Sequence, residues 1–290
     1  MVRSTGIGYP IRYNARMALR ALDVTTWGFF RFHGADAKKF LQGLVTADMN
    51  ALRPGAMLPA CVLTPKGLLV ADCELYEETP ETILAVTRPA AAVGFLSAFD
   101  KKIMLSDSTF KALRSQTAWL VIGEGFARGL PWNRLAEPAR LLLGVDPPED
   151  AEPLAPEEFE LLRVASGFPW FGADIDGTTL PLEGRQDAAI AMDKGCYMGQ
   201  ETVSRLARVG HVNRMLVGLR FDGAAPAPGA PLTRDGKATG MVTSVAGTRG
   251  LGMARLEDGA AGTVLDAGGA RAEVVTVPGW PKPLSGQRRA

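Results

Sequence analysis

The sequence is poor in the residues from which disulfide frameworks, zinc sites and histidine-based catalytic sites are built. Its 290 residues include three cysteines and two histidines. Cys61, Cys73 and Cys196 are an odd number and lie far apart, so they predict neither a disulfide framework nor a zinc site. We therefore expect no metal ligands and a reducing compartment, which is the cytoplasm in a bacterium and the mitochondrial matrix in a eukaryote.

The sequence also lacks an excess of charge, a long apolar run and a nucleotide-binding glycine pattern. It has 32 basic and 31 acidic residues and a formal net charge of +1. This balance disfavours direct nucleic-acid binding, which usually requires a basic excess. No apolar run approaches the ~20 residues of a membrane helix. No Gly-x-Gly-x-x-Gly or phosphate loop follows a strand pattern, so dinucleotide and nucleoside triphosphate sites are not predicted.

Length and hydrophobic pattern predict two or three α+β domains. In the first half, strand patterns at 27–33 and 83–87 alternate with helix patterns at 37–46 and 89–99. Two apolar runs, 57–63 and 68–76, are joined by Thr64-Pro65-Lys66-Gly67 and predict a hairpin. The pattern also predicts short strands at 103–105, 109–113 and 118–123 and a helix at 156–165, followed beyond residue 214 by the short strands of a small β-barrel or sandwich. The residues at the two ends, with Arg3, Arg12 and Arg16 in the first and three prolines in the second, are interpreted as a basic extension and a loose tail.

Two carboxylates occupy one face of the second hairpin strand. Asp72 and Glu74 alternate there with Ala71, Cys73 and Leu75. Either they form a solvated sheet face or one of them has a functional role, and the sequence favours the solvated face. His33 and His211 are isolated, so we expect structural roles for both.

The densest group of reactive residue types lies at 194–205. It comprises Lys194, Gly195, Cys196, Tyr197, Gly199, Gln200, Glu201 and Arg205. Lys194 or Arg205 would lower the pKa of the Cys196 thiol if either side chain pointed toward it; alternatively, the cysteine is a packed residue in a glycine turn. One thiol does not hold an iron–sulfur cluster by itself, so a transient sulfur or redox exchange is the favoured role. Glu201 and Arg205 have the i,i+4 spacing of a helical ion pair.

An aromatic loop precedes this group. Trp170 and Phe171 would either stack on a flat heterocycle or close the core between two domains, and the sequence leaves both alternatives open.

The run at 194–205 resembles the signature of the YgfZ proteins, the GcvT-like folate-binding family associated with iron–sulfur cluster maintenance and, in some bacteria, with tRNA modification. Eight of its twelve positions match. Similar pieces are found at 40–48, 64–67, 167–169 and 240–244, so the resemblance covers roughly residues 25 to 280. It implies a GcvT-like three-domain ring around a central hole, with two mixed α+β domains and a C-terminal β-barrel. The implied domains are 1–52 with 112–205, an inserted domain at 53–111, and the barrel with its loose tail at 206–290.

The same frame belongs to the aminomethyltransferase of glycine cleavage, and two departures from that enzyme are visible. The enzyme has adjacent aspartates where this chain has Ala71 and Asp72, and it has a folate-contacting glutamate where this chain has Ala165. The resemblance implies tetrahydrofolate or a one-carbon derivative as the cofactor. Asp72 and Glu183 would accept hydrogen bonds from the pterin, and Trp170 and Phe171 would pack on its ring.

The resulting hypothesis is a folate-binding accessory protein, not a classical enzyme, that supports assembly or repair of iron–sulfur enzymes through the thiol of Cys196. Its partners would be iron–sulfur proteins or their assembly machinery, with no membrane. Two alternatives remain: a tetrahydrofolate-dependent aminomethyl or methyl transferase or demethylase that acts through Asp72, and a tRNA-modification factor.

Overall fold

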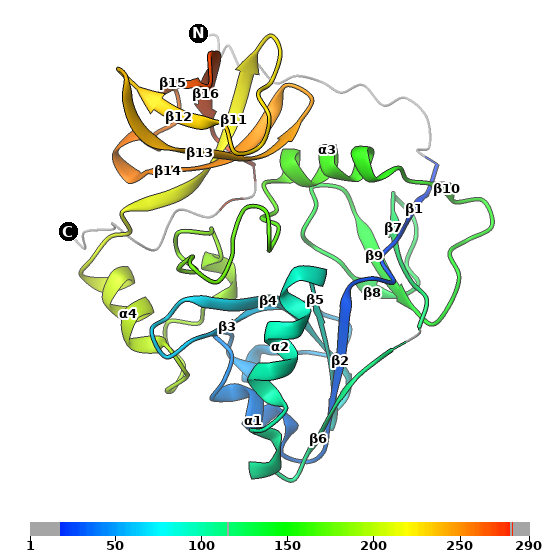
Figure 1. The fold of residues 1–290 in the computed structure, drawn as a ribbon. Coiled ribbons are helices and arrows are strands. Elements are labelled where there is room, and N and C mark those ends of the chain that lie inside the picture. Colours follow the sequence, from blue (N-terminus) through cyan, green and yellow to red (C-terminus); the bar gives the residue numbers. More distant parts are fainter. Residues whose placement is uncertain (1–17, 115, 279, 281–290) are drawn as a thin grey trace, which may run out of the picture.

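The structure is a computed structural model that describes residues 18–114, 116–278 and 280 (Figure 1). Two five-stranded sheets form the body of the molecule and a closed six-stranded barrel lies beside them. The predicted basic N-terminal extension and most of the predicted loose tail lie outside the described residues. Among the helices of the described part, none is long and apolar enough to cross a membrane.

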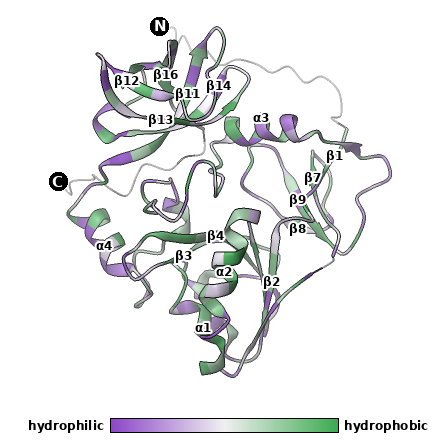
Figure 2. Ribbon diagram, in the orientation of Figure 1, coloured by the Kyte–Doolittle hydropathy of each residue, from purple (hydrophilic) through white to green (hydrophobic). Residues whose placement is uncertain are grey.

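The first sheet has the strand order β3-β4-β5-β2-β6, and all neighbouring strands are antiparallel. The strands are β2 (Gly28–His33), β3 (Leu58–Leu63), β4 (Leu69–Thr79), β5 (Thr82–Thr87) and β6 (Thr109–Ala112). The predicted hairpin is confirmed as β3 and β4. One face carries a core of phenylalanine and aliphatic side chains from the sheet and from the helices α1 (Ala37–Gln42) and α2 (Ala92–Phe99), and α2 is largely green in Figure 2.

The predicted strand at 103–105 is wrong. Residues Ile103–Leu105 form a 3-10 turn, η3, in which the Ser106 amide bonds to the carbonyl of Ile103. Met104 and Leu105 are 84% and 89% exposed. Their apolar character therefore does not reflect burial in a sheet, which is what the sequence pattern assumed.

The second sheet packs on the other face of the first. Its order is β10-β1-β7-β9-β8, with β1 (Arg20–Asp23), β7 (Ala118–Ile122), β8 (Leu130–Pro131), β9 (Ala139–Leu143) and β10 (Glu152–Pro153). Phe29, Leu84 and Val86 of the first sheet share a core with Leu120 and Leu141 of the second. Both faces of the first sheet are therefore buried, and this determines the environment of Asp72 and Glu74.

Helix α3 (Pro156–Ser166) connects this body to the barrel. Proline at its first position, acidic residues in its first turn and Gly167 at φ 65° mark its ends, so the prediction of a helix from 156 is confirmed. The helix packs against β13 and β14 of the barrel (Figure 1).

The C-terminal barrel is closed in the order β11-β14-β13-β12-β15-β16. Its strands are β11 (Arg214–Asp222), β12 (Pro231–Arg234), β13 (Lys237–Ala246), β14 (Arg249–Arg255), β15 (Val264–Ala267) and β16 (Ala270–Val275). A barrel, and not a sandwich, is thus the correct alternative. The sequence pattern missed β12 and β15, which are only four residues long each.

The predicted domain boundaries at residues 52/53 and 111/112 stay a prediction. β2 lies in one sheet with the strands of 53–111, whereas β1 lies in the sheet formed by strands of 118–153. Strand pairing describes sheets and not independently folding units, so it leaves these boundaries open.

Candidate functional site

The loop that contains Cys196 is seated on the segment that follows α1. The Lys194 ammonium donates to the main-chain oxygens of Gln42, Val45 and Ala47 at 2.7, 2.8 and 2.6 Å. The Met198 amide bonds to the carbonyl of Gly43 at 3.2 Å. The loop then enters helix α4 (Gln200–Arg208).

The hairpin turn between β3 and β4 supports the other end of the loop. Gly199 and Gly67 have φ of 80° and 83°, a conformation in which a side chain is strained. A Cβ on Gly199 would lie 2.6 Å from the carbonyl oxygen of Thr64, and one on Gly67 would lie 2.8 Å from Cβ of Thr202. Both glycines are therefore required by close packing. The motifs at 40–48, 64–67 and 194–201, distant in sequence, meet at this loop.

Cys196 lies at the outer side of the loop. Its thiol is free and the residue is exposed, so the alternative of a packed cysteine in a glycine turn is wrong. A Cβ placed on Gly195 would meet no atom within 4 Å. Tyr197, the next residue, is instead buried at 7% exposure. The loop thus presents Gly195 and Cys196 to solvent between two inward-facing side chains, Lys194 and Tyr197.

The charged neighbours of the thiol have other roles than those expected. Lys194 is engaged by three main-chain oxygens, and burial lowers its pKa to about 8. Glu201 and Arg205 are both exposed on α4, where hydrophilic purple prevails in Figure 2. Within the described residues the two side chains form no ion pair, so the expected i,i+4 bridge is wrong. Gln200 begins α4 and is half-buried.

Asp72 and Glu74 are buried, and the expectation of a solvated sheet face is wrong. Both residues are 0% exposed, because the second sheet covers this face of β4. Glu74 pairs with Arg88 and, at 2.7 Å, with Nε of Arg134. Asp72 has no hydrogen bond to either carboxylate oxygen, and its closest cation is Nε of Arg88 at 3.6 Å. Burial raises the pKa of Asp72.

Arg88 also occupies an aromatic box. Its guanidinium carbon lies 5.0 Å from the ring centres of both Trp27 and Trp132, 5.2 Å from that of Phe168 and 6.0 Å from that of Trp170. This is cation–π geometry, which partly compensates for the loss of hydration. Sequence reasoning missed Arg88 and Arg134. The one available signal was the pair of carboxylates, which needs cations once both faces of the sheet are covered.

The remaining cysteines lie in the two strands of the same hairpin, where Cys61 is paired with Asp72 and Cys73 with Ala60. Cys61 and Cys73 are 0% exposed, and burial raises the pKa of both thiols well above its usual range. They are therefore packing residues of the hydrophobic core.

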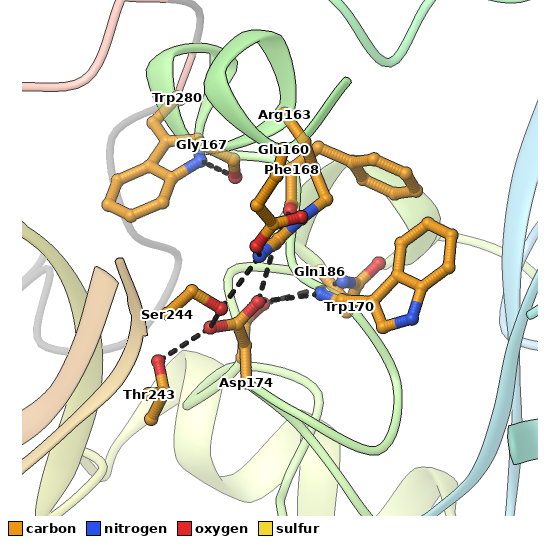
Figure 3. Close-up of polar contacts among 11 residues, drawn as sticks. Glu160, Arg163, Gly167, Phe168, Trp170, Asp174, Gln186, Thr243, Ser244 and Trp280 are labelled. Carbon is orange, nitrogen blue, oxygen red and sulfur yellow. Dashed lines mark hydrogen bonds and ion pairs between the residues drawn. The ribbon is translucent and has the colours of Figure 1, made fainter. Parts of the chain in front are cut away.

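The aromatic loop after α3 joins the sheets to the barrel (Figure 3). Oδ1 of Asp174 accepts from the hydroxyls of Thr243 and Ser244 in β13 at 2.5 and 2.7 Å. Oδ2 accepts from Arg163 at 2.6 Å and from the Trp170 amide at 2.9 Å. Arg163 is 1% exposed and also donates to Ser244. This network fixes the barrel against α3.

The two aromatic residues of this loop pack inside the protein. The Trp170 ring makes edge contacts with Trp27, Phe159 and Phe168, and Phe171 is 8% exposed. Their positions match the alternative in which they close the core. Contact with a folate stays a prediction for both.

A polar cavity of about 770 Å³ lies where the barrel meets the chain on either side of α4. It is lined by Glu183, His211, Val212, Asn213, Arg214, Thr239, Arg255, Leu256 and Glu257. Glu183 is 3.3 Å from Nε of Arg214 and accepts from the Leu180 amide at 3.1 Å. Of the four predicted folate contacts, Glu183 alone lines this cavity.

Comparison with known proteins gives two matching domain models. The GCVT N-terminal domain matches residues 13–125, and the CAF17 C-terminal beta-barrel domain matches residues 213–282. A tRNA-modifying protein YgfZ of Shigella boydii is 27% identical over 66% of this chain and 69% of its own length. An iron-sulfur cluster assembly factor IBA57 homolog, mitochondrial, of Phaeosphaeria nodorum is 25% identical over 78% of this chain and 67% of its own length.

A solved structure shows the fold. The glycine cleavage system aminomethyltransferase T of Bartonella henselae superimposes with a TM-score of 0.75 at 17% identity, covering 94% of this chain and 88% of that one. The predicted fold class, mixed α+β domains with a C-terminal barrel in a GcvT-like arrangement, is confirmed.

Proposed function

Because the chain belongs to the YgfZ/CAF17 family, which is related to the aminomethyltransferases, we propose that it is a folate-binding factor in the assembly or repair of iron–sulfur enzymes, with Cys196 as its functional thiol. The observation that carries the proposal is the exposed thiol on a loop anchored at both ends. A thiol presented in this way reaches a partner protein without any unfolding.

The thiol acts transiently and together with groups from a partner. Cys61 and Cys73 are buried and remain protonated, and no group of three or more His, Cys, Asp or Glu side chains within the described residues is arranged to hold a metal ion. A cluster usually requires four protein ligands. The iron–sulfur cargo or its sulfur would therefore be held jointly, with Cys196 as the one contribution from this chain.

The cavity beside Glu183 has the chemistry that a folate needs. Its 770 Å³ lies within the range of about 300–1,000 Å³ that is typical of ligand sites. Glu183 would accept from the pterin's amino group and ring N–H, while Arg214 and Arg255 would hold the anionic tail. Bound tetrahydrofolate would supply a one-carbon carrier, and the residues of this chain would bind and orient it.

Two measurements test the two halves of this proposal. In cells that lack the protein, Cys196→Ser should fail to restore the activity of iron–sulfur enzymes, whereas Glu201→Gln, on the same surface, should restore it. Full restoration by Cys196→Ser would remove the thiol from the mechanism. In calorimetry, tetrahydrofolate should bind the parent, and Glu183→Gln should weaken the binding by about tenfold, the effect of one lost charged hydrogen bond. Absence of binding at millimolar tetrahydrofolate would refute the folate half.

A second candidate is a one-carbon transferase. Two observations favour this activity. The chain shares its fold with an aminomethyltransferase, and both carboxylate oxygens of the buried Asp72 lack a hydrogen-bond partner. Ala165, at the position of the enzyme's folate-contacting glutamate, disfavours it. Turnover of an aminomethyl donor with tetrahydrofolate, lost in Asp72→Asn, would establish this activity and displace the accessory role.

A further inference from the structure

The side chain of Lys194 ends in a cradle of three main-chain carbonyls. Its ammonium has three N–H donors, and the oxygens of Gln42, Val45 and Ala47 lie 2.6–2.8 Å away, one for each donor. Gln42 is the last residue of α1, so its carbonyl oxygen has no intrahelical donor and lies at the end of the helix that carries partial negative charge. The cradle is therefore a cation site that the protein fills with its own side chain.

The Lys194 ammonium has a second neighbour in the same loop. It lies 5.1 Å from the ring centre of Tyr197, within cation–π range, and this ring is buried in the core of the first sheet. Asp48 is the carboxylate whose charge acts on the ammonium. Cation, ring and carbonyls thus hold together the two residues that flank Gly195 and Cys196.

The exposed pair has no such support. Gly195 meets nothing within 4 Å of a built Cβ, and Cys196 is exposed. Beyond Tyr197, the Met198 amide returns to the same segment through the carbonyl of Gly43. The path of the exposed dipeptide is therefore set by its flanks, and on the N-terminal side that flank is Lys194.

We propose that Lys194 is a positioning residue: its ammonium is bound by the carbonyls of Gln42, Val45 and Ala47 and thereby fixes the loop that presents Cys196. When the side chain is removed, these three carbonyls form a binding site for a primary ammonium ion. The site is independent of folate and of iron–sulfur chemistry, because every contact that defines it lies within this chain.

Hydrogen exchange of the loop tests the proposal in the full chain. Lys194→Met keeps the length of the side chain but has no donor, and it should speed exchange of the 189–198 amides by at least about tenfold, as expected when one or more charge-assisted hydrogen bonds are lost. Lys101→Met is the matched control, because Lys101 is exposed and lies outside the cradle. It should leave exchange unchanged. An Lys194→Met loop that exchanges within twofold of the parent would overturn the proposal.

Chemical rescue separates the cradle from general packing. Lys194→Ala removes the equivalent of propylammonium, so propylammonium chloride should return the exchange rate toward that of the parent. Tetramethylammonium chloride has the same charge but no N–H donor, and it should not. Equal effects of the two salts would refute the carbonyl site.

The parent protein gives a test that needs no variant. In NMR of the parent, at a pH below the pKa of Lys194, its Nζ should show couplings across hydrogen bonds to the carbonyl carbons of Gln42, Val45 and Ala47, whereas Nζ of the exposed Lys101 should show none. Absence of all three couplings from Lys194 would overturn the proposal even if the variants fail to fold.

Discussion

The buried charge cluster allows a strong prediction about Glu74. The cluster contains two carboxylates and two guanidinium groups, from Asp72, Glu74, Arg88 and Arg134, so its formal charge is balanced. Glu74 makes both direct ion pairs, one with each arginine. Glu74→Gln removes one negative charge and leaves this largely buried cluster with a net positive charge.

The cost follows from burial. Glu74 and Arg88 are 0% exposed, and the Arg134 side chain is 12% exposed. Removing one partner of a buried pair typically destabilises a protein by about 3–5 kcal/mol. We expect Glu74→Gln near the lower end, at about 3 kcal/mol, since its amide oxygen still accepts one hydrogen bond. The unfolding midpoint should fall by about 6–12 °C at roughly 2–4 °C for each kcal/mol.

The measurement is thermal or urea unfolding followed by circular dichroism, with Glu78→Gln as the control. Glu78 also bonds an arginine, Arg31, at 2.6 Å, but both side chains are partly exposed. Neutralising an exposed pair costs about 0–1 kcal/mol. If Glu74→Gln unfolds within about 1 kcal/mol of the parent, Glu74 is not the buried counterion of the two arginines and the reasoning fails.

Three further outcomes follow from the same contacts. Burial raises the pKa of Asp72 above the unfolded value of 3.8, so keeping this carboxylate ionised costs stability as the pH rises above that value. The stability of the parent relative to Asp72→Asn should therefore fall as the pH is raised above 3.8 in urea titrations, and a rise would contradict the burial argument. Gly199→Ala should destabilise by more than about 1 kcal/mol, whereas Gly195→Ala should change unfolding by less than about 0.5 kcal/mol; equal effects would show that the close approach to the hairpin turn is unimportant. Asp174→Asn should lower the free energy of unfolding by about 3 kcal/mol and release the barrel to proteolysis, because Arg163 loses its buried counterion and keeps only the partly exposed Glu160; resistance equal to the parent would refute this.

Local sequence patterns predicted the elements whose signals are local. The hairpin was read from its Pro-Gly turn, and α3 from its proline start, acidic first turn and glycine stop. The favoured role of Cys196, transient exchange, requires an accessible thiol, and the residue is exposed. The barrel followed from short strands between glycine-rich turns, although two strands of four residues were missed.

The wrong and missed predictions have one physical cause. Each concerns a side chain whose environment is formed by a segment distant in sequence. Alternation in β4 indicates which side chains share a face, but not that a second sheet covers that face and buries Asp72 and Glu74. Likewise, no pattern near Lys194 shows that its acceptors belong to the last residue of α1 and the segment after it, about 150 residues earlier. Contacts between distant segments determine both outcomes.

The long sequence separation between the Cys196 loop and the segments that support it determines when the loop can form during folding. The hydrogen bonds of Lys194 span 147–152 residues of chain, and the turn that supports Gly199 lies in the first quarter of the sequence. Closing such long loops is slow and follows the formation of local structure. During synthesis the presenting loop can therefore be assembled only after α1 and the hairpin exist, so a correctly displayed Cys196 marks a chain in which these early segments have already folded.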